Sequence, residues 1–268
     1  MAGDAGKIAL EASGVRKVYH KDGQSLQVLD VERFSAREGE FITVIGPSGC
    51  GKSTFLHIVG GFIKAEGGSI RVYGEEVSGP GPDRGIMFQE FALFPWKSVA
   101  GNVAWGLEAQ GFPRDKIEET VRKYLEMMGL ADFRNHFPAE LSGGMKQRVA
   151  LARVLAFDPK VLLMDEPFGA LDAQTRETMQ EELTRLWERT GKTIVFVTHD
   201  IEEAVFLGDR VVVLTARPAR VREEVRIDLP RPRDLTIKKS SECHRYRNYI
   251  WDLIRSEVSS SDQSSSRR

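Results

Sequence analysis

Short continuous apolar runs alternate with longer amphipathic stretches along this chain. The runs at 41–45, 161–164 and 193–197 are typical of strands that are buried on both faces of a parallel sheet. Two shorter runs, at 69–73 and 85–88, also favour strands. The pattern therefore predicts an α/β fold whose sheet is mainly parallel.

Two segments near the N-terminus, 8–19 and 28–35, favour strands of an antiparallel β edge. From about 96 to 157 the pattern becomes helical, with apolar residues at i, i+4 and i+7: Ile117, Val121, Tyr124, Leu125 and Met128. A second apolar stripe indicates a packed helix before the run at 193–197, and comprises Met179, Leu183, Leu186 and Trp187.

These changes of period divide the chain into parts. We expect an α/β core at 1–95 and 159–235, interrupted by a helical subdomain at 96–158. A C-terminal helical extension follows at 236–258. The remaining segment, 259–268, is rich in serine and predicted to be disordered.

Composition narrows the class of protein. The chain has 268 residues with 41% apolar and 29% charged residues, and its net charge of −1 argues against a nucleic-acid-binding surface. Its two cysteines provide no disulfide framework, which favours a reducing, cytoplasmic compartment. Since there is no secretory signal or apolar run of about 18 residues, we expect the chain neither to leave the cell nor to span the bilayer by itself.

The segment between the apolar run 41–45 and a helix-like stretch has the sequence of a P-loop, and the strand, loop and helix context agrees. Its glycines let backbone N–H groups surround phosphate oxygens, Lys52 adds a full positive charge, and Ser53 offers a hydroxyl ligand for Mg²⁺. The motif alone leaves open a glycine-rich turn that caps an ordinary helix. The predicted nucleotide-binding residues here are Gly46, Pro47, Ser48, Gly49, Cys50, Gly51, Lys52, Ser53 and Thr54.

Two acidic residues end the run at 161–164. Acids at the carboxyl end of a parallel strand point into the crevice where α/β folds bind ligands. Asp165 is suited to the Mg²⁺ shell, and Glu166 to orienting or deprotonating an attacking water. The alternative is a strand-to-turn junction with solvated carboxylates, which the nearby P-loop makes less favourable.

A histidine follows the run at 193–197 in a comparable position. His199 is predicted to lie beside the nucleotide, because it too comes at the carboxyl end of a buried strand. The remaining histidines have no such context and are interpreted as structural or solvated: His20, His57, His136 and His244.

A second anion site is predicted at Ser142-Gly143-Gly144. Ser142 is a good N-cap, and the two glycines expose the first backbone amides of a helix that continues through Val149 and Leu155. The segment Leu141-Ser142-Gly143-Gly144-Met145 resembles the signature motif of ATP-binding cassette (ABC) proteins. Met145 stands where the family usually has Gln. We expect this difference to affect only those contacts that a Gln side chain would have made.

The other motifs of the ABC family follow in family order. Tyr19 stands where the family stacks an aromatic ring on adenine, Gln89 matches the Q-loop, Asp172 the D-loop, and His199 the switch histidine. The resemblance implies that Glu166, His199, Lys52 and Gln89 act in ATP hydrolysis, and that Gln89 joins Ser53 and Asp165 around Mg²⁺. It also implies that Ser142, Gly143 and Gly144 bind ATP held by a second chain, so the protein would work as a homodimer or as a pair with a similar chain. Asp172 is a further nucleotide-binding residue that the resemblance implies.

The segment 93–106 most resembles ABC ATPases of the nitrate, taurine and aliphatic-sulfonate uptake group. This implies two permease subunits, an extracytoplasmic solute-binding protein and a peripheral position on the cytoplasmic face of the cell membrane. The aromatic stretch 91–99 is either hinge packing or part of the groove for a permease helix. Alternatives are an ABC ATPase of another importer or of an exporter, a non-transport ABC ATPase acting on DNA or ribosomes, and a simple P-loop kinase.

Many arginines interspersed with acids follow 211–214, among them Arg217, Arg220, Arg222 and Arg233. Mixed charges favour a solvated face, and attraction to an anionic membrane leaflet is an alternative. Within this region 221–229 fits a short strand, and 246–258 an amphipathic terminal helix.

Overall fold

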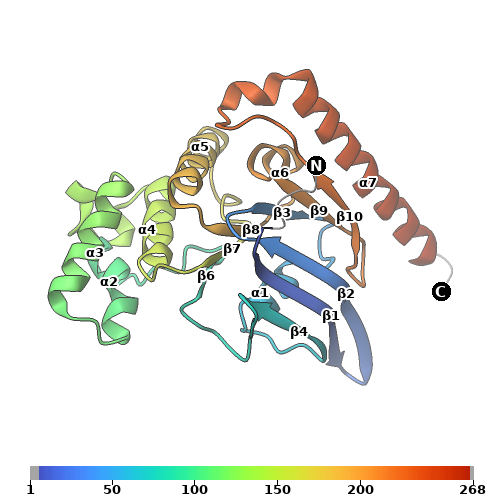
Figure 1. The fold of residues 1–268 in the computed structure, drawn as a ribbon, viewed down its shortest axis with the longest axis horizontal. Coiled ribbons are helices and arrows are strands. Elements are labelled where there is room, and N and C mark those ends of the chain that lie inside the picture. The colour runs from blue at the N-terminus through green and yellow to red at the C-terminus, as the bar shows by residue number, and fades with distance from the viewer. Residues whose placement is uncertain (1–5, 266–268) are drawn as a thin grey trace.

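The computed structural model describes the backbone of residues 6–265 and the side chains of residues 6–257. Its strands form two sheets, and helices pack around them (Figure 1). The larger sheet has the order β10-β9-β3-β8-β7-β6, and all its pairings are parallel except that of β10 with β9. Its strands are β3 (Phe41–Ile45), β6 (Arg84–Met87), β7 (Val161–Asp165), β8 (Thr193–Val197), β9 (Arg210–Leu214) and β10 (Val221–Arg226).

The smaller sheet is antiparallel and has the order β2-β1-β4-β5. Its strands are β1 (Ile8–Lys21), β2 (Gln24–Arg37), β4 (Gly67–Val72) and β5 (Glu75–Glu76). The two sheets confirm the predicted α/β fold with a mainly parallel sheet and an antiparallel β edge. β1 and β2 are longer than predicted, because Asp22 and Gly23 both have positive φ and close a two-residue hairpin turn.

Burial explains why the central strands could be read from the sequence. Every residue of β3, β7 and β8 is buried. Strands covered on both faces need apolar side chains at consecutive positions, so they appear as continuous runs. Because these strands are parallel, their carboxyl ends lie at one edge of the sheet.

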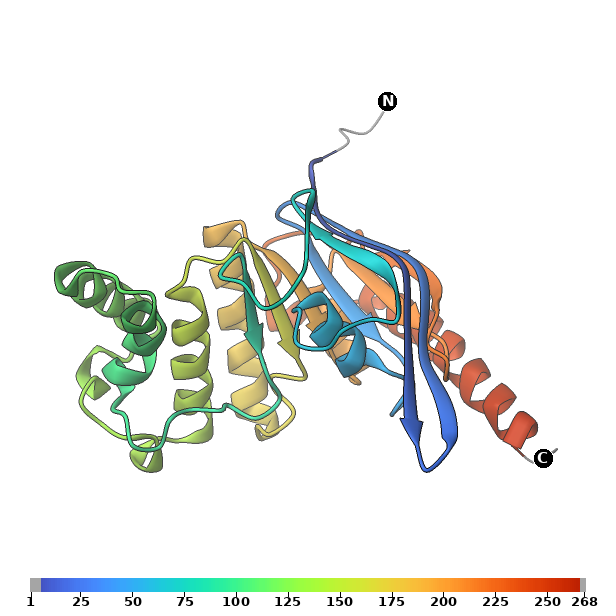
Figure 2. The ribbon, with the colours of Figure 1, turned by 90° about the horizontal axis from the view of Figure 1, so that it is seen from below.

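The helices expected between 96 and 158 form a lobe that extends away from the sheets (Figure 2). It contains α2 (Val99–Ala109), α3 (Arg114–Met127), α4 (Gly143–Leu155) and two short 3-10 helices, η1 (Ala131–Phe133) and η2 (Pro138–Glu140). The other helices are α1 (Lys52–Val59), α5 (Ala173–Thr190), α6 (Ile201–Leu207), η3 (Leu235–Lys239) and α7 (Ser241–Ser265). Among the described residues no helix is both long and apolar enough to cross a membrane.

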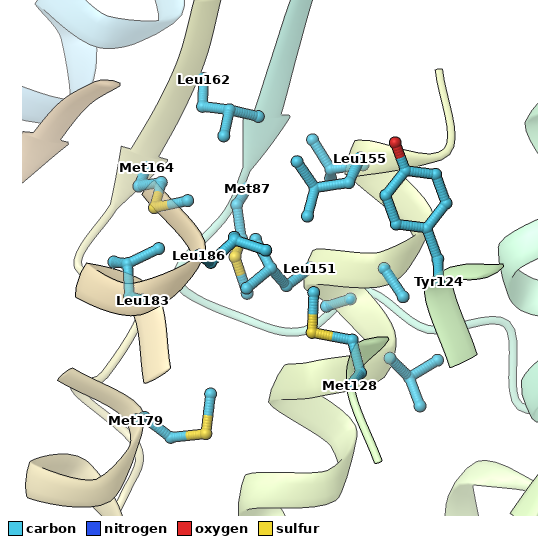
Figure 3. Close-up of a cluster of buried hydrophobic side chains, with 14 of the residues drawn as sticks. Met87, Tyr124, Met128, Leu151, Leu155, Leu162, Met164, Met179, Leu183 and Leu186 are labelled. Carbon is cyan, nitrogen blue, oxygen red and sulfur yellow. The ribbon is translucent and has the colours of Figure 1, made fainter. Parts of the chain in front are cut away.

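The lobe shares its hydrophobic core with the larger sheet (Figure 3). Tyr124 and Met128 of the lobe belong to the same buried cluster as Met87 and Met164 of the sheet and Met179 of α5. α4 contacts both α2 and β6, so it links the lobe to the sheet. The lobe is therefore packed continuously onto the sheet that carries the candidate site.

The C-terminal helix differs from the prediction. α7 runs from Ser241 to Ser265, so it begins earlier and ends later than the predicted helix 246–258, and residues 266–268 of the predicted tail lie outside the described residues. Serine disfavours a helix only slightly, and a helix that has already formed extends at little cost. The predicted short strand is also shorter, since β10 ends at Arg226.

Candidate functional site

The P-loop connects β3 to α1 and requires glycine where it touches the hairpin. Gly51 has a φ of 129°, and a Cβ atom there would lie 2.9 Å from Cδ2 of Leu29. No side chain caps α1. The first backbone amides of this helix are therefore available to an anion.

Lys52 is buried at the start of α1 and bonds to its own loop. Its Nζ atom donates to the carbonyl oxygens of Gly46 at 3.0 Å and Pro47 at 3.1 Å. The Lys52 ammonium thus stabilises the conformation of the P-loop, and Lys52 also lines the pocket next to this loop. Cys50 is also buried, and this burial raises the pKa of its thiol, which makes the thiol unreactive.

Two oxygen donors from different elements meet beside the P-loop. The Ser53 hydroxyl donates to Oδ1 of Asp165 at 3.0 Å. Burial raises the pKa of the Asp165 carboxyl, and the hydrogen bond from Ser53 opposes this effect. A hydroxyl and a carboxylate at this separation fit the oxygen ligands that Mg²⁺ prefers. Within the described residues, no group of three or more His, Cys, Asp or Glu side chains could hold a metal ion by itself.

Glu166 and His199 come from the ends of neighbouring strands and are hydrogen-bonded. Nδ1 of His199 lies 2.8 Å from Oε2 of Glu166. The Glu166 backbone has a φ of 44°, a left-handed conformation that is uncommon for a residue with a side chain. Its N–H donates to the carbonyl of Val197 at 2.9 Å, which fixes this conformation at the strand end.

Half of the predicted residues line a single open pocket. These are Tyr19, Ser48, Gly49, Gly51, Lys52, Ser53, Thr54, Glu166 and His199. Tyr19 is half-exposed at the rim, and Lys17 lies over its ring at 5.2 Å. The structure thus combines a phosphate-binding loop, a hydrogen-bonded Glu-His pair and an aromatic ring in one cavity.

The remaining P-loop residues and Gln89 do not line this pocket. Gly46, Pro47 and Cys50 lie within the loop and shape it. The Gln89 amide instead approaches the segment that follows Glu166, since a Cβ atom on Gly169 would lie 3.8 Å from its Nε2 atom.

Ser142, Gly143, Gly144 and Asp172 also lie outside the pocket, at the adjoining starts of α4 and α5. Ser142 accepts a hydrogen bond from the N–H of Met145 at 3.3 Å, as predicted for an N-cap. Asp172 caps α5 by accepting from the N–H of Thr175 at 3.0 Å, and hydrogen bonding to Thr175 lowers its pKa. A Cβ atom on Gly144 would lie 2.8 Å from Thr175, so glycine permits this close contact.

A family comparison decides the identity of the fold. The model of the family described as ABC transporter matches residues 29–169. The chain belongs to the ABC transporter family. Within this family it is an ATP-binding cassette that hydrolyses ATP.

Named ABC proteins match the chain along most of its length. An uncharacterized ABC transporter ATP-binding protein of Methanocaldococcus jannaschii, MJ0412, is 48% identical and covers 95% of this chain and 94% of its own. The nitrate import ATP-binding protein NrtD of Synechocystis sp. is 45% identical over 92% and 95% of the two chains. The taurine import ATP-binding protein TauB of Roseobacter denitrificans is 47% identical over 87% and 90%.

A solved ABC cassette has the same architecture. The cassette MJ0796, determined as a dimer in a post-hydrolysis state with ADP and Pi, matches with a TM-score of 0.71 and 32% identity. The match covers 82% of this chain and all of that one. ABC cassettes therefore form dimers, and a fold with this topology binds nucleotide.

The ABC motifs did not reveal two residues near the pocket. Nε2 of His57 lies 3.6 Å from Oδ2 of Asp165, so this histidine is next to the candidate Mg²⁺ ligand. Its position one helical turn after Ser53 was the available signal. Arg217 lines the pocket itself, and no sequence pattern indicated this.

The prediction of a solvated arginine face is also wrong for Arg233. Only 4% of this residue is exposed. Its guanidinium donates to backbone carbonyls, and the burial lowers its pKa to about 10. Fixed carbonyl acceptors compensate for the desolvation that made burial of this arginine unexpected.

Proposed function

We propose that the chain is the ATP-hydrolysing subunit of an ABC importer and acts as a pair of identical copies. The observation that carries this proposal is the division of the motifs. The P-loop, Glu166 and His199 share one pocket, whereas Ser142 and Gly144 lie outside it. A second copy would complete the site with its own signature motif, as the dimeric state of the related cassette MJ0796 supports.

In this proposal, the P-loop binds the phosphates of ATP. The amides of 49–54 and Lys52 surround the phosphate oxygens, and Tyr19 stacks on adenine. Ser142, Gly143 and Gly144 of the second copy bind the γ-phosphate from the opposite side, beside Asp172. Charge that develops on the transferring phosphoryl group is then stabilised from both sides.

Mg²⁺, bound by Ser53, Asp165 and Gln89, would neutralise negative charge on the phosphates. Glu166 accepts the proton of the attacking water as general base. His199 keeps the Glu166 carboxylate in position through their hydrogen bond of 2.8 Å and contacts the γ-phosphate. Binding of ATP would close the dimer and hydrolysis would reopen it, which couples chemistry to movement of the permease.

An exposed aromatic surface at the border of the helical lobe is the proposed permease contact. Trp96 is 72% exposed, and the ring of Phe94 lies 5.6 Å from that of Trp96 and 4.8 Å from that of Trp105. Exposed aromatic clusters of this kind are typical of protein contacts. Phe91 and Leu93 are partly buried against the core, which fits the hinge-packing alternative for those two residues only.

The solute is proposed to be a small anion such as nitrate, taurine or an aliphatic sulfonate. The named import functions of NrtD and TauB, at 45% and 47% identity, support this class. A binding protein and the permease would select the solute, since the residues described above handle ATP or transmit motion. Two permease subunits would hold the cassettes on the cytoplasmic face of the membrane.

The test is purification of a tagged Glu166→Gln chain from gently solubilised membranes of its own cell, followed by mass spectrometry. We expect a polytopic permease, and a solute-binding protein encoded with it, to be identified. Recovery of an exporter-type membrane partner would contradict the importer, and recovery of ribosomal or DNA-bound partners would contradict transport.

A matched pair of variants tests the contact surface. Trp96→Ala should lose the permease while the isolated chain keeps its ATPase activity. The control, Phe112→Ala, changes an aromatic residue that is 44% exposed elsewhere on the lobe, and should retain the permease. Equal recovery of the permease with both variants would contradict the proposed contact.

A further inference from the structure

The loop 215–220, between β9 and β10, lies directly beside the P-loop. Its Ala219 N–H donates to the carbonyl of Val28 at 2.8 Å, and the Asp30 N–H donates to the carbonyl of Ala219 at 3.0 Å. Val28 itself lines the nucleotide pocket. This loop is therefore fixed to the wall of the pocket by backbone hydrogen bonds.

Internal bonds also hold the loop in one shape. The Thr215 hydroxyl donates to the carbonyl of Pro218 at 3.0 Å and accepts from the N–H of Arg220 at 3.0 Å. On its outer side, the Ala216 N–H donates to the Glu257 carboxylate of α7 at 3.3 Å. A side chain carried by this loop consequently has a defined position.

Arg217 extends from the loop into the nucleotide pocket. It lines that pocket together with the P-loop residues, and a Cβ atom on Gly49 would lie 3.5 Å from its Nη2 atom. The guanidinium therefore lies close to Gly49 of the P-loop, on the wall of the same pocket.

The charge of Arg217 distinguishes it from its neighbours. Arginines nearby pair with carboxylates: Arg220 with Asp30 at 2.7 Å, Arg222 with Glu257 at 2.5 Å, and Arg231 with Asp209 at 2.8 Å. Within the described side chains, no carboxylate forms an ion pair with Arg217. Its positive charge remains available on the pocket wall.

We propose that Arg217 is a nucleotide-binding residue that contacts the phosphate chain in the same copy as the P-loop. A guanidinium binds phosphate oxygens through paired, charge-assisted hydrogen bonds, and a rigid loop reduces the entropy lost on binding. This inference rests on the nucleotide binding of the proposed function. It is independent of the permease and the solute.

Equilibrium binding of ADP to the full chain tests this role. Arg217→Ala should weaken ADP binding by about tenfold, the equivalent of about 1.4 kcal/mol. Arg217→Lys should recover part of the ADP affinity, since lysine keeps the positive charge but lacks the paired N–H donors of the guanidinium group. Arg220→Ala is the matched control, because it removes an arginine of the same loop whose partner is Asp30, and it should leave the affinity nearly unchanged.

The dependence of ADP affinity on salt concentration distinguishes two roles of Arg217: direct contact with phosphate, and support of the shape of the pocket. The loss of affinity in Arg217→Ala should shrink as sodium chloride is raised, because screening weakens the attraction in the native chain. An unchanged ADP affinity in Arg217→Ala would overturn the proposal. So would an equal loss in Arg220→Ala, or a loss in Arg217→Ala that is independent of salt. Failure to recover a permease would leave all these results intact.

Discussion

Nδ1 of His199 lies 2.8 Å from Oε2 of Glu166, although 33 residues separate them in the chain. Each residue follows a buried strand, and β7 and β8 pair in parallel, so their ends coincide. The pair joins a carboxylate that can accept a proton to a ring that fixes its orientation.

Replacing Glu166 by Gln should stop hydrolysis and preserve ATP binding. Loss of a general base lowers the rate about 10²- to 10⁴-fold. Because the nucleotide is then not consumed, we expect a stable ATP-bound dimer in size-exclusion chromatography with light scattering. A variant that stayed monomeric at millimolar ATP and Mg²⁺ would contradict the shared site.

Replacing His199 by Ala should reduce ATP turnover by at least about a hundredfold, because the Glu166 carboxylate loses its orienting partner. ATP affinity should change little, since the P-loop contacts remain. Steady-state ATPase assays and equilibrium binding check the two effects. His244→Ala, an exposed histidine on α7, serves as the control and should behave like the native chain. Near-normal turnover in His199→Ala would refute the assignment.

Ser142→Ala should affect activity much more than stability. Removing an N-cap costs about 1 kcal/mol of stability, whereas the second anion site would lose its hydroxyl. Ser98→Ala is the matched control, because Ser98 caps α2 by accepting from the N–H of Gly101 at 3.1 Å. Both variants should have similarly lowered melting temperatures, and only Ser142→Ala should lose ATPase activity. Equal ATPase rates of Ser142→Ala and Ser98→Ala would contradict a role of the signature motif in hydrolysis.

Glu203→Gln should stabilise the protein at neutral pH. Burial raises the pKa of Glu203, so the folded protein resists an ionisation that the unfolded chain undergoes from about pH 4.3 upwards. The free energy of unfolding of the native chain therefore decreases as the pH rises from about 4.3, the pKa in the unfolded chain, to the raised pKa of Glu203 in the folded state. Gln has a similar shape and can still accept from Gln180, whose Nε2 donates to Glu203 at 2.9 Å.

At low pH, the variant Glu203→Gln and the native chain should have the same melting temperature. As the pH rises towards neutral, the melting temperature of the variant should increasingly exceed that of the native chain. Each 1 kcal/mol corresponds to roughly 2–4 °C for a chain of this size. A difference that did not vary with pH would show that ionisation of Glu203 is not its cause.

Arg233→Ala should destabilise the fold by about 3 kcal/mol, because buried carbonyl groups lose their donor. The acceptors are Val205 at 3.1 Å, Phe206 at 2.9 Å, Gly208 at 2.8 Å, and Ile227 and Leu229 at 3.3 Å. Arg226→Ala, at a side chain that is 83% exposed, should change stability by less than about 0.5 kcal/mol. Chemical denaturation measures both, and similar values would contradict the structural role of Arg233.

The sequence predicts best what is encoded locally. β3, β7 and β8 were recognisable because each is buried throughout, and the P-loop because its residues are contiguous. Arg217 could not be found in this way, since it reaches the pocket only through the pairing of Ala219 with Val28, far away in the chain. Arg233 was wrongly predicted to be solvated, because its hydrogen-bond partners are backbone carbonyls. Every residue has a backbone carbonyl, so the sequence does not indicate which of them accept from Arg233.

The methionines in the core shared by the helical lobe and the larger sheet have a mechanical consequence. Met87, Met128, Met164 and Met179 lie along this seam, among leucines of α4 and α5. Unbranched thioether side chains adapt to altered surroundings by changing rotamer, without large voids opening. We therefore expect this core to adapt to small displacements of the lobe against the sheet without exposing apolar side chains to water.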